Sequence, residues 1–464
     1  MNESRYKWIA FLFLSAIYGA LQNKIILYVG FFLFFLSLAG RLLKREDSTK
    51  IDEAFIDILI ISTIIPDNYI VILLSLLSFS FTIKSHDEKD HMIAAIIILA
   101  IWNAIVNLVY PINLLFYLIY TLPFFIIYIY FKRFDLNRNI YNYIIVDLYF
   151  IIASQLISII TYAITHLSIV RAANDLDWVT GTFGVYQGSV LMFVSICCST
   201  ILLFDFSNQK NKNSLLFSII SLFVALSTTS VTYTLILFIS VIGCSILSSK
   251  LKTSSKIALI SLVAIGMIVF IFASPDWILN EIPKLFDHDY FTKRIKKMNA
   301  YNDVFISLPN EFGALRSIFG CGAGQYSSRA ALTCTGTYID SYKSFFPVSM
   351  SQYTERFILY SNNVDEGMSS NSMSQIISIQ GEFGYIGLLV MFTFFGSIIR
   401  KSKSVFSLMI VWFFIGLLFV DNVLEFAKYG VFFWLCFKMC NSNSTKQLNS
   451  MIEYPEKTKF ERKV

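Results

Sequence analysis

Long apolar runs recur along the whole chain, and they constrain its fold more than any other feature. The runs are roughly 15–22 residues long, and about 20 apolar residues let a helix cross the hydrocarbon core of a bilayer. Hydrophobic residues make up 56% of the chain, whereas soluble domains have about 45–50%. A transmembrane β-barrel would instead show alternating segments of about ten residues. The sequence therefore predicts an all-α polytopic integral membrane protein.

We expect about fourteen transmembrane helices in a single membrane domain, residues 1–464, because no internal repeat or separate soluble region is visible. The first apolar run follows Arg5 and Lys7 like a signal peptide, but it has no A-x-A-like cleavage site, so we interpret it as a retained span. The spans are expected near residues 7–23, 25–39, 53–66, 69–83, 92–110, 112–131, 140–165, 185–204, 214–228, 232–248, 256–273, 374–399, 404–420 and 429–445.

Basic residues fall in alternate loops, and this asymmetry predicts the orientation. By the positive-inside rule the loops that carry them are cytoplasmic. Both termini then lie in the cytoplasm, with residues 441–464 as a polar cytoplasmic tail. The basic residues of this side are Arg41, Lys44, Arg45, Lys50, Lys84, Lys89, Lys132, Arg133, Arg138, Lys210, Lys212, Lys250, Lys252, Lys256, Arg400, Lys401 and Lys403.

Two loops of the opposite face are long, at residues 166–184 and 274–372. Loops longer than about 12–15 residues are usually functional or disordered. The second is rich in aromatic residues and in balanced charge, so we expect it to be ordered, with helices on the membrane surface. Cys321 and Cys334 both lie in this loop, and the sequence leaves open whether they form a disulfide or remain free thiols.

Several function classes find no support in the sequence. The chain has no G-x-x-x-x-G-K-[ST] motif for nucleotides and no H-E-x-x-H or Cys/His spacing for a metal. Its Lys and Arg residues are scattered over short loops, so no nucleic-acid partner is predicted. The glycine-dense run FGCGAGQYSSR at 319–329 has no βαβ context for a dinucleotide. We expect a tight loop beside a polar ligand there, and no metal or cofactor.

Five arginines lie in the two external loops: Arg171, Arg294, Arg316, Arg329 and Arg356. The planar guanidinium fork matches phosphate oxygens. Several of these residues come where the chain re-enters the bilayer, the place expected for the pyrophosphate of a membrane-anchored lipid. Each could instead snorkel to a head group or pair with a loop carboxylate.

The stretch SSNSMSQIISIQGEFGYIGLLVMF at 369–392 places polar groups in an apolar run. One interpretation is functional: Ser370, Asn371 and Ser372 line a cavity mouth, and Glu382 faces that cavity or bonds a neighbouring loop. The glycines would then let another segment approach. The other interpretation is structural: an N-terminal cap, a glycine packing face and a Glu382 that snorkels to the interface. The glycines are Gly381, Gly384 and Gly387.

Three stretches, in this order, resemble the O-antigen polymerase and ligase superfamily, and most of all a Wzy-type polymerase. WVTGTFGVYQGSVLMFV at 178–194 is similar to the Gly-Thr-Phe segment of that family. RSIFGCGAGQYSS at 316–328 is similar to its Phe-Gly-x-Gly loop. SSNSMSQIISIQGEFGYIGLL at 369–389 is similar to its His-Asn-Ser … Glu-x-Gly-x-x-Gly helix entry. The span number and the large late external loop match as well.

The resemblance implies a membrane-embedded, metal-independent glycosyltransferase fold of the C class. Its members act on oligosaccharides carried by undecaprenyl pyrophosphate at the periplasmic face of the bacterial inner membrane, beside membrane lipid. A chain-length regulator and a flippase are the implied protein partners. Carried onto this chain, the resemblance and the loop positions nominate Arg171, Arg294 and Glu382 as catalytic residues, and Arg316, Arg356, Gly322, Gly324, Ser370 and Asn371 as substrate-binding residues.

The chain also departs from the family pattern. Nine residues separate Arg171 from Gly181 where polymerases have ten, and Arg294 has no glycine at that distance. Ser370 stands where the ligase branch has a histidine, which argues against an O-antigen ligase that transfers glycan to lipid A-core.

Other questions stay open. A flippase or transporter of lipid-linked oligosaccharide remains an alternative, although the predicted spans hold few charges. The sugars, the linkage, the stereochemistry, the chain-length control, the oligomeric state and the general base remain undetermined. The carboxylates considered for the base are Asp175, Asp177, Asp303, Glu366 and Glu382.

Overall fold

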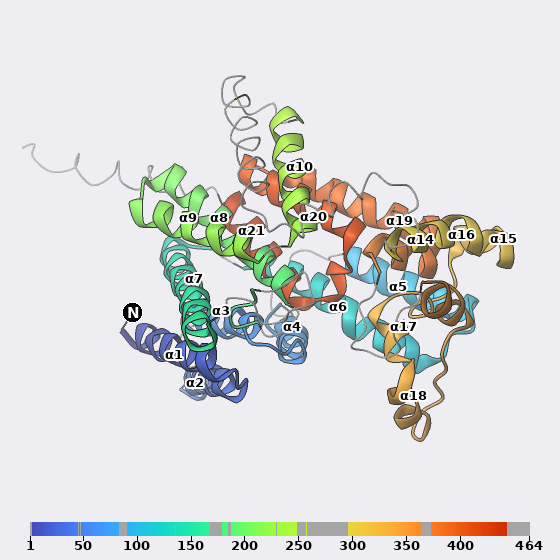
Figure 1. The fold of residues 1–464 in the computed structure, drawn as a ribbon, viewed down its shortest axis with the longest axis horizontal. Coiled ribbons are helices and arrows are strands. Elements are labelled where there is room, and N and C mark those ends of the chain that lie inside the picture. Colours follow the sequence, from blue (N-terminus) through green and yellow to red (C-terminus); the bar gives the residue numbers. More distant parts are fainter. Residues whose placement is uncertain are drawn as a thin grey trace, which may run out of the picture. The chain divides into compact units, whose positions relative to one another are not determined.

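The computed structural model describes residues 2–44, 46, 48–82, 91–134, 136–167, 179–183, 187–228, 230–247, 257, 296–362 and 373–442. All regular secondary structure in these residues is helical (Figure 1). Every predicted span coincides with a helix except 256–273, of which only residue 257 is described. The prediction of an all-helical fold is therefore confirmed for the described residues, while the number of spans stays a prediction.

Five described helices are long and apolar enough to cross a membrane. These are α2 (Ile25–Leu43), α6 (Pro111–Arg133), α7 (Arg138–His166), α8 (Gly188–Gln209) and α19 (Gln375–Lys401). Shorter apolar helical stretches lie at Tyr69–Phe79, Ala94–Val106, Lys212–Ser227, Thr232–Ile246 and Val405–Val420.

The chain divides into two compact units, described separately here. Unit 1 comprises residues 1–67, 131–230 and 432–464. Besides α2, α7 and α8, it holds α1 (Asn2–Leu21), α3 (Ser48–Ile64), α9 (Lys212–Ser227) and most of α21 (Ala427–Asn441).

Small polar side chains join helices α8 and α9 of unit 1. The hydroxyls of Ser199 and Ser218 are 2.8 Å apart, and the Ser221 hydroxyl donates to the Ser195 carbonyl at 2.8 Å. Serine lets helix backbones approach closely and supplies hydrogen bonds where lipid offers none. These contacts explain how two apolar helices recognise each other in a membrane.

The Gly-Thr-Phe segment is buried in unit 1. The Gln155 side chain donates to the Thr182 hydroxyl at 2.8 Å and accepts from the Thr182 N–H at 2.9 Å. Gly181 has a φ of +53°, and a Cβ there would lie 2.2 Å from the Gln155 Oε1 atom. The segment is therefore a packed turn against helix α7, and only glycine fits it.

Unit 2 comprises residues 68–130 and 231–431. Its long helices, with α19 and most of α6, are α4 (Tyr69–Thr82), α5 (His91–Val106), α10 (Val231–Leu247) and α20 (Val405–Val420). Its short elements are α14 (Lys296–Asn302), the π-helix η2 (Asp303–Ser307), α15 (Leu308–Phe312), α16 (Leu315–Phe319), α17 (Arg329–Thr333), α18 (Gly336–Lys343), the π-helix η3 (Thr354–Tyr360) and the 3₁₀ turn η4 (Val423–Glu425).

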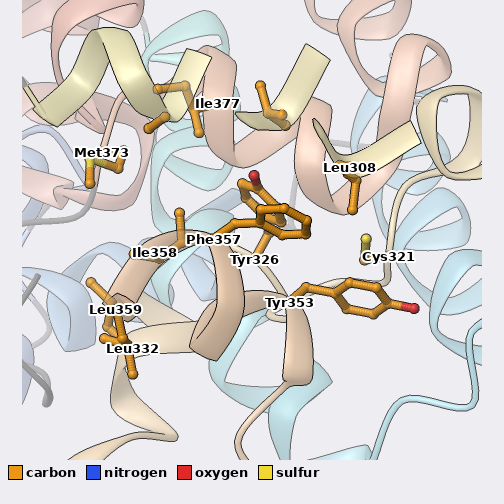
Figure 2. Close-up of a cluster of buried hydrophobic side chains, with 12 residues drawn as sticks. Leu308, Cys321, Tyr326, Leu332, Tyr353, Phe357, Ile358, Leu359, Met373 and Ile377 are labelled. Atoms are coloured by element: carbon orange, nitrogen blue, oxygen red, sulfur yellow. The ribbon is translucent and has the colours of Figure 1, made fainter. Parts of the chain in front are cut away.

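Residues 296–362, the described part of the loop that is expected outside the membrane, are mostly helical. The apolar residues of this segment form a core of their own around Tyr326 and Phe357, whose rings are stacked 6.1 Å apart (Figure 2). Ile377 of α19 belongs to this core. The loop is thus packed onto the head of α19 rather than left in solvent.

Cys321 and Cys334 are free thiols in this loop, so the disulfide considered for them is not formed. Both are buried, and they belong to different apolar clusters. Burial raises the pKa of both thiols, that of Cys334 to about 12. Each therefore acts as a small apolar residue.

Candidate functional site

Helix α19 has a polar first part that is interrupted by glycine. The Ser374 hydroxyl caps the helix by accepting from the Ile377 N–H at 3.2 Å. At Gly384 the backbone leaves the helical conformation, with φ 65° and ψ −159°. Residues that bear a Cβ rarely adopt this conformation. Glu382, completely buried, lies just before the break.

Residues 319–328, which we call the glycine loop, close around the Glu382 side chain. Its Oε2 atom accepts from the Gly324 N–H at 3.0 Å. Its Oε1 atom accepts from the N–H groups of Tyr326 and Ser328, both at 3.3 Å. Hydrogen bonds to an ionised acceptor are roughly twice as strong as neutral ones. Glu382 therefore anchors the glycine loop to α19.

Glycines allow the two backbones to meet. Gly320 has a φ of +74°, and a Cβ there would lie 2.2 Å from the carbonyl carbon and oxygen of Glu382. A Cβ at Gly384 would lie 2.3 Å from a backbone oxygen of the segment before the loop. The Cys321 N–H donates to the Gly381 carbonyl at 2.8 Å, next to this contact. The glycine loop and the kink in α19 form one close-packed junction.

This geometry explains why a carboxylate and glycines stand in an apolar stretch. Glu382 is not exposed, so the interpretation that it snorkels to the interface is wrong. Its bonds to a neighbouring loop agree with the alternative interpretation. Because both oxygens are held by backbone donors, the geometry gives Glu382 a positioning role, and its catalytic role stays a prediction.

A second pair, the half-buried Arg329 and the buried Glu425, lies where the glycine loop ends. The Arg329 N–H donates to the Glu425 Oε2 atom at 2.5 Å. The guanidinium carbon lies 3.7 Å from the centre of the Phe426 ring. The buried Arg329 Nε has no hydrogen-bond partner among the described residues, and no described carboxylate lies within 4.0 Å of the guanidinium. The site therefore holds an arginine whose donors are largely free.

The electrostatics of this pair favour an incoming anion. Burial, together with the negative charge of Glu382, raises the pKa of Glu425 to about 8, although the Arg329 N–H opposes the shift. Burial lowers the pKa of Arg329, and the charge of Glu425 opposes that shift. The Glu425 Oε1 atom is buried and has no partner in the described part of the chain. The pair thus offers an unsatisfied cation beside a carboxyl that titrates near neutral pH.

A hydrogen-bonded network fixes the segment that carries Glu425. The Tyr233 hydroxyl donates to the Asp421 carboxylate at 2.9 Å and lies 2.7 Å from the Tyr429 hydroxyl. The Asn422 side chain donates to the Ser378 hydroxyl of α19 at 3.3 Å. These bonds connect α10, α19 and α21 around the chain between α20 and α21. Glu425 is therefore held on a rigid support.

An apolar pocket of about 50 Å³ lies beside α19 and reaches Leu424, the residue before Glu425. Its walls come from α5, α6 and α19 and are almost entirely apolar, with Tyr117, Thr121 and Gln375 as the polar exceptions. Such a lining accepts a hydrocarbon segment and offers few partners to a polar one. Apolar and charged surfaces therefore lie next to each other in unit 2.

Arg316 and Arg356, both predicted to bind substrate, contact other residues of unit 2. Arg316 donates to the Asn107 side chain and, at 3.3 Å, to the Gly320 carbonyl. Arg356 is paired with Glu311 at 3.3 Å and is 62% exposed, as in an ordinary surface ion pair. The structure does not bring either guanidinium to the Arg329–Glu425 pair by any described hydrogen bond or ion pair.

The remaining predicted site residues divide into two groups. Gly322 and Gly324 lie in the glycine loop and donate to the Glu382 carbonyl and carboxylate, so the structure brings these three together. The others lie outside the described residues: Arg171, Arg294, Ser370 and Asn371.

Sequence reasoning missed Glu425 and did not choose Arg329. A signal for Glu425 was present, since the run DNVLEFAK at 421–428 places charged residues between two apolar helices. Charged residues at such depth are costly and often functional. Arg329 could not be separated from the other external arginines, because its burial and its stacking on Phe426 depend on contacts between distant segments.

The described residues contain no group of three or more His, Cys, Asp or Glu side chains that could hold a metal ion. No protein-family model matches the chain, and no curated protein matches it in sequence.

Proposed function

We propose that the chain is an O-antigen polymerase. It would join oligosaccharide repeat units carried by undecaprenyl pyrophosphate at the periplasmic face of the bacterial inner membrane. The observation that carries the proposal is the half-buried Arg329 guanidinium, which stacks on Phe426 and whose buried Nε atom has no hydrogen-bond partner among the described residues. A partly desolvated guanidinium with free donors favours an anionic ligand.

The reaction makes two demands on the protein. A hydroxyl of the acceptor sugar attacks the anomeric carbon of the donor, a new C–O bond forms, and the bond to undecaprenyl pyrophosphate breaks. Negative charge on the leaving pyrophosphate must be stabilised, and the hydroxyl proton must be accepted. In our proposal the Arg329 guanidinium does the first, and the Glu425 carboxylate, once ionised, does the second.

The surroundings support this assignment. A general base works best when its pKa lies near the operating pH, and the pKa of Glu425 is raised to about 8. The apolar pocket beside α19 ends at Leu424, so a prenyl segment bound there would place its pyrophosphate towards the charged pair. Glu382 and the glycine loop would hold Arg329 in position, since Arg329 directly follows Ser328.

The first test compares surface polysaccharide from a strain that lacks the gene with the same strain complemented by variants. We expect the deletion to reduce the polysaccharide ladder to core plus a single repeat, and the wild-type gene to restore it. Arg329→Ala should lower polymerisation by about 100-fold or more, the range for loss of a donor to a developing charge. Arg329→Lys should restore little, because lysine lacks the planar fork.

Arg356→Ala is the matched control, because Arg356 belongs to the same loop but is exposed and ion-paired. It should restore a normal ladder at equal protein level. Equal ladders from the Arg329→Ala and wild-type genes would contradict the role of Arg329. Complete loss of polysaccharide from the core in the deletion strain would indicate a ligase or a flippase instead.

A flippase or transporter of lipid-linked oligosaccharide is the second candidate, and one observation favours it. The predicted spans were expected to hold few charges, but unit 1 gathers Lys7, Asp57 and Asp147 among its helices, with both aspartates 1% exposed. Ionisable residues inside membrane helices often mark transport or proton pathways. A transporter would leave polymerisation intact in a purified system supplied with lipid-linked substrate, whereas our proposal requires the purified protein to lengthen the chains.

A further inference from the structure

A buried charged cluster lies in unit 1 and contains no residue of the proposed reaction. Four helices contribute to it: α1, α2, α3 and α7. The Lys7 ammonium of α1 lies 3.6 Å from the Asp57 carboxylate of α3 and donates to the Ser37 hydroxyl of α2 at 2.9 Å. The Tyr143 hydroxyl of α7 donates to the same Asp57 oxygen at 2.5 Å.

Asp147 of α7 completes the cluster with a second carboxyl. The side chains of Asp57 and Asp147 lie within hydrogen-bonding reach of each other, and each is 1% exposed. Two ionised carboxylates are both acceptors only, so neither can donate to the other. Their contact therefore needs one proton between them, as in other carboxyl pairs that share a site.

Unpartnered polar atoms point to the same conclusion. The Asp57 Oδ1 and Asp147 Oδ2 atoms are buried and have no hydrogen-bond donor among the described residues. The indole nitrogen of Trp8, which is 0% exposed, also lacks a partner there and lies next to the Asp147 carboxyl. The stacking of Trp8 on Phe150 of α7, at 5.8 Å, holds the indole in this place.

The charges of the cluster balance only when the proton is present. With one proton bound, Lys7 carries +1 and the carboxyl pair carries −1. Arg41 of α2 also acts on Asp57 electrostatically, and its guanidinium lies 3.7 Å from the Glu53 carboxylate of α3. Loss of the proton leaves two buried carboxylates with one ammonium, and an unpaired buried charge is strongly unfavourable.

We propose that Asp57 and Asp147, together with Lys7, form a proton-binding site inside the helix bundle of unit 1. One proton bridges the two carboxyl groups; on release, the O–H bond breaks, the proton passes to water, and the net charge of the cluster changes from 0 to −1. Lys7, whose side chain is 11% exposed, marks the edge from which water reaches the site. Proton binding thereby controls the packing of α1, α3 and α7. This inference does not depend on the proposed polymerase activity.

The test uses the purified full-length protein and infrared difference spectroscopy of protonated carboxyl groups. We expect a carbonyl band of a buried carboxylic acid at low pH that disappears as the pH rises. The variants Asp57→Asn and Asp147→Asn should each lack this band. Asp205→Asn is the matched control, since Asp205 is equally buried in unit 1 but accepts from the Ser214 hydroxyl at 2.5 Å; it should keep the band.

Thermal stability of the same proteins supplies a second measurement that separates a proton site from a fixed ion pair. The proton is bound in the folded state, so wild-type stability should fall as the pH rises through its release. Asp147→Asn imitates the protonated form and should remove this fall. A titrating band that survives in both Asn variants would overturn the proposal. So would displacement of the band by sodium ions at constant pH, which would indicate a cation site instead.

Discussion

At the scale of single residues, Glu425 is the group whose charge depends most on the fold. Burial and the charge of Glu382 raise its pKa from 4.5 to about 8, so the folded chain favours the protonated acid. The contribution of this group to stability is then complete below about 4.5 and is lost as the pH rises through about 8. Activity should change in the opposite direction, because only the carboxylate accepts a proton.

We therefore predict that the polymerisation rate of the wild-type protein rises as the pH approaches 8. Glu425→Gln should abolish this rise and lower the rate at every pH, since glutamine cannot accept the proton. The measurement is the pH profile of chain lengthening by purified protein, with thermal unfolding followed in parallel. Glu311→Gln is the control, because Glu311 is an exposed partner of Arg356. Retention of the wild-type profile by Glu425→Gln would rule out the base role.

At the scale of elements, the junction between the glycine loop and α19 depends on a close approach of backbones. We predict that Gly320→Ala destabilises it by about 1–3 kcal/mol or more, the cost of overpacking. A Cβ at Gly320 would lie 2.2 Å from backbone atoms of Glu382, which cannot move aside as a flexible side chain would. The expected result is faster protease cleavage within residues 313–330 of the folded protein.

Gly313→Ala separates this clash from backbone strain. Gly313 also has a positive φ, +92°, but a Cβ there would meet nothing within 4 Å. Both variants carry the strain, and only Gly320→Ala carries the clash. Equal effects of the two substitutions would mean that the close approach does not stabilise the loop.

The sequence predicted those elements that depend on neighbouring residues better than those that depend on contacts between distant segments. Helical spans follow from runs of apolar residues, so their positions were predicted closely, and the glycine-dense run at 319–329 indicated a tight loop. That this loop bonds Glu382, more than fifty residues away, was only one of two interpretations. The choice between them required tertiary contacts, because a carboxylate in an apolar helix can snorkel or be buried. Tertiary contacts were also needed to distinguish Arg329 from the other four arginines of the two loops that are expected outside.

At the scale of the whole molecule, each unit pairs an apolar bundle with its own buried charges. Unit 2 holds Arg329 and Glu425, and unit 1 holds Lys7, Asp57 and Asp147. A prediction of spans from apolar runs cannot say where the few charged residues within those runs lie. In the structure they are gathered from helices that are distant in sequence, which is how an ionisable group in a membrane becomes tolerable. If each cluster acts within its own unit, variants of Arg329 or Glu425 should change polymerisation without changing the proton site. Variants of Asp57 or Asp147 should change the proton site without changing polymerisation.

The orientation of the chain gives the last prediction. The positive-inside rule places the loop after α19, with Arg400, Lys401 and Lys403, in the cytoplasm, and the loop of residues 274–372 outside it. We expect a membrane-impermeant maleimide to label Lys343→Cys in intact cells and to label Lys403→Cys only after the membrane is opened. Both positions are exposed, and all seven native cysteines are buried, so background labelling should be low. Wild-type protein treated alike is the control. Labelling of Lys403→Cys alone in intact cells would invert the topology and move the Arg329–Glu425 pair to the face where lipid-linked oligosaccharides are made rather than polymerised.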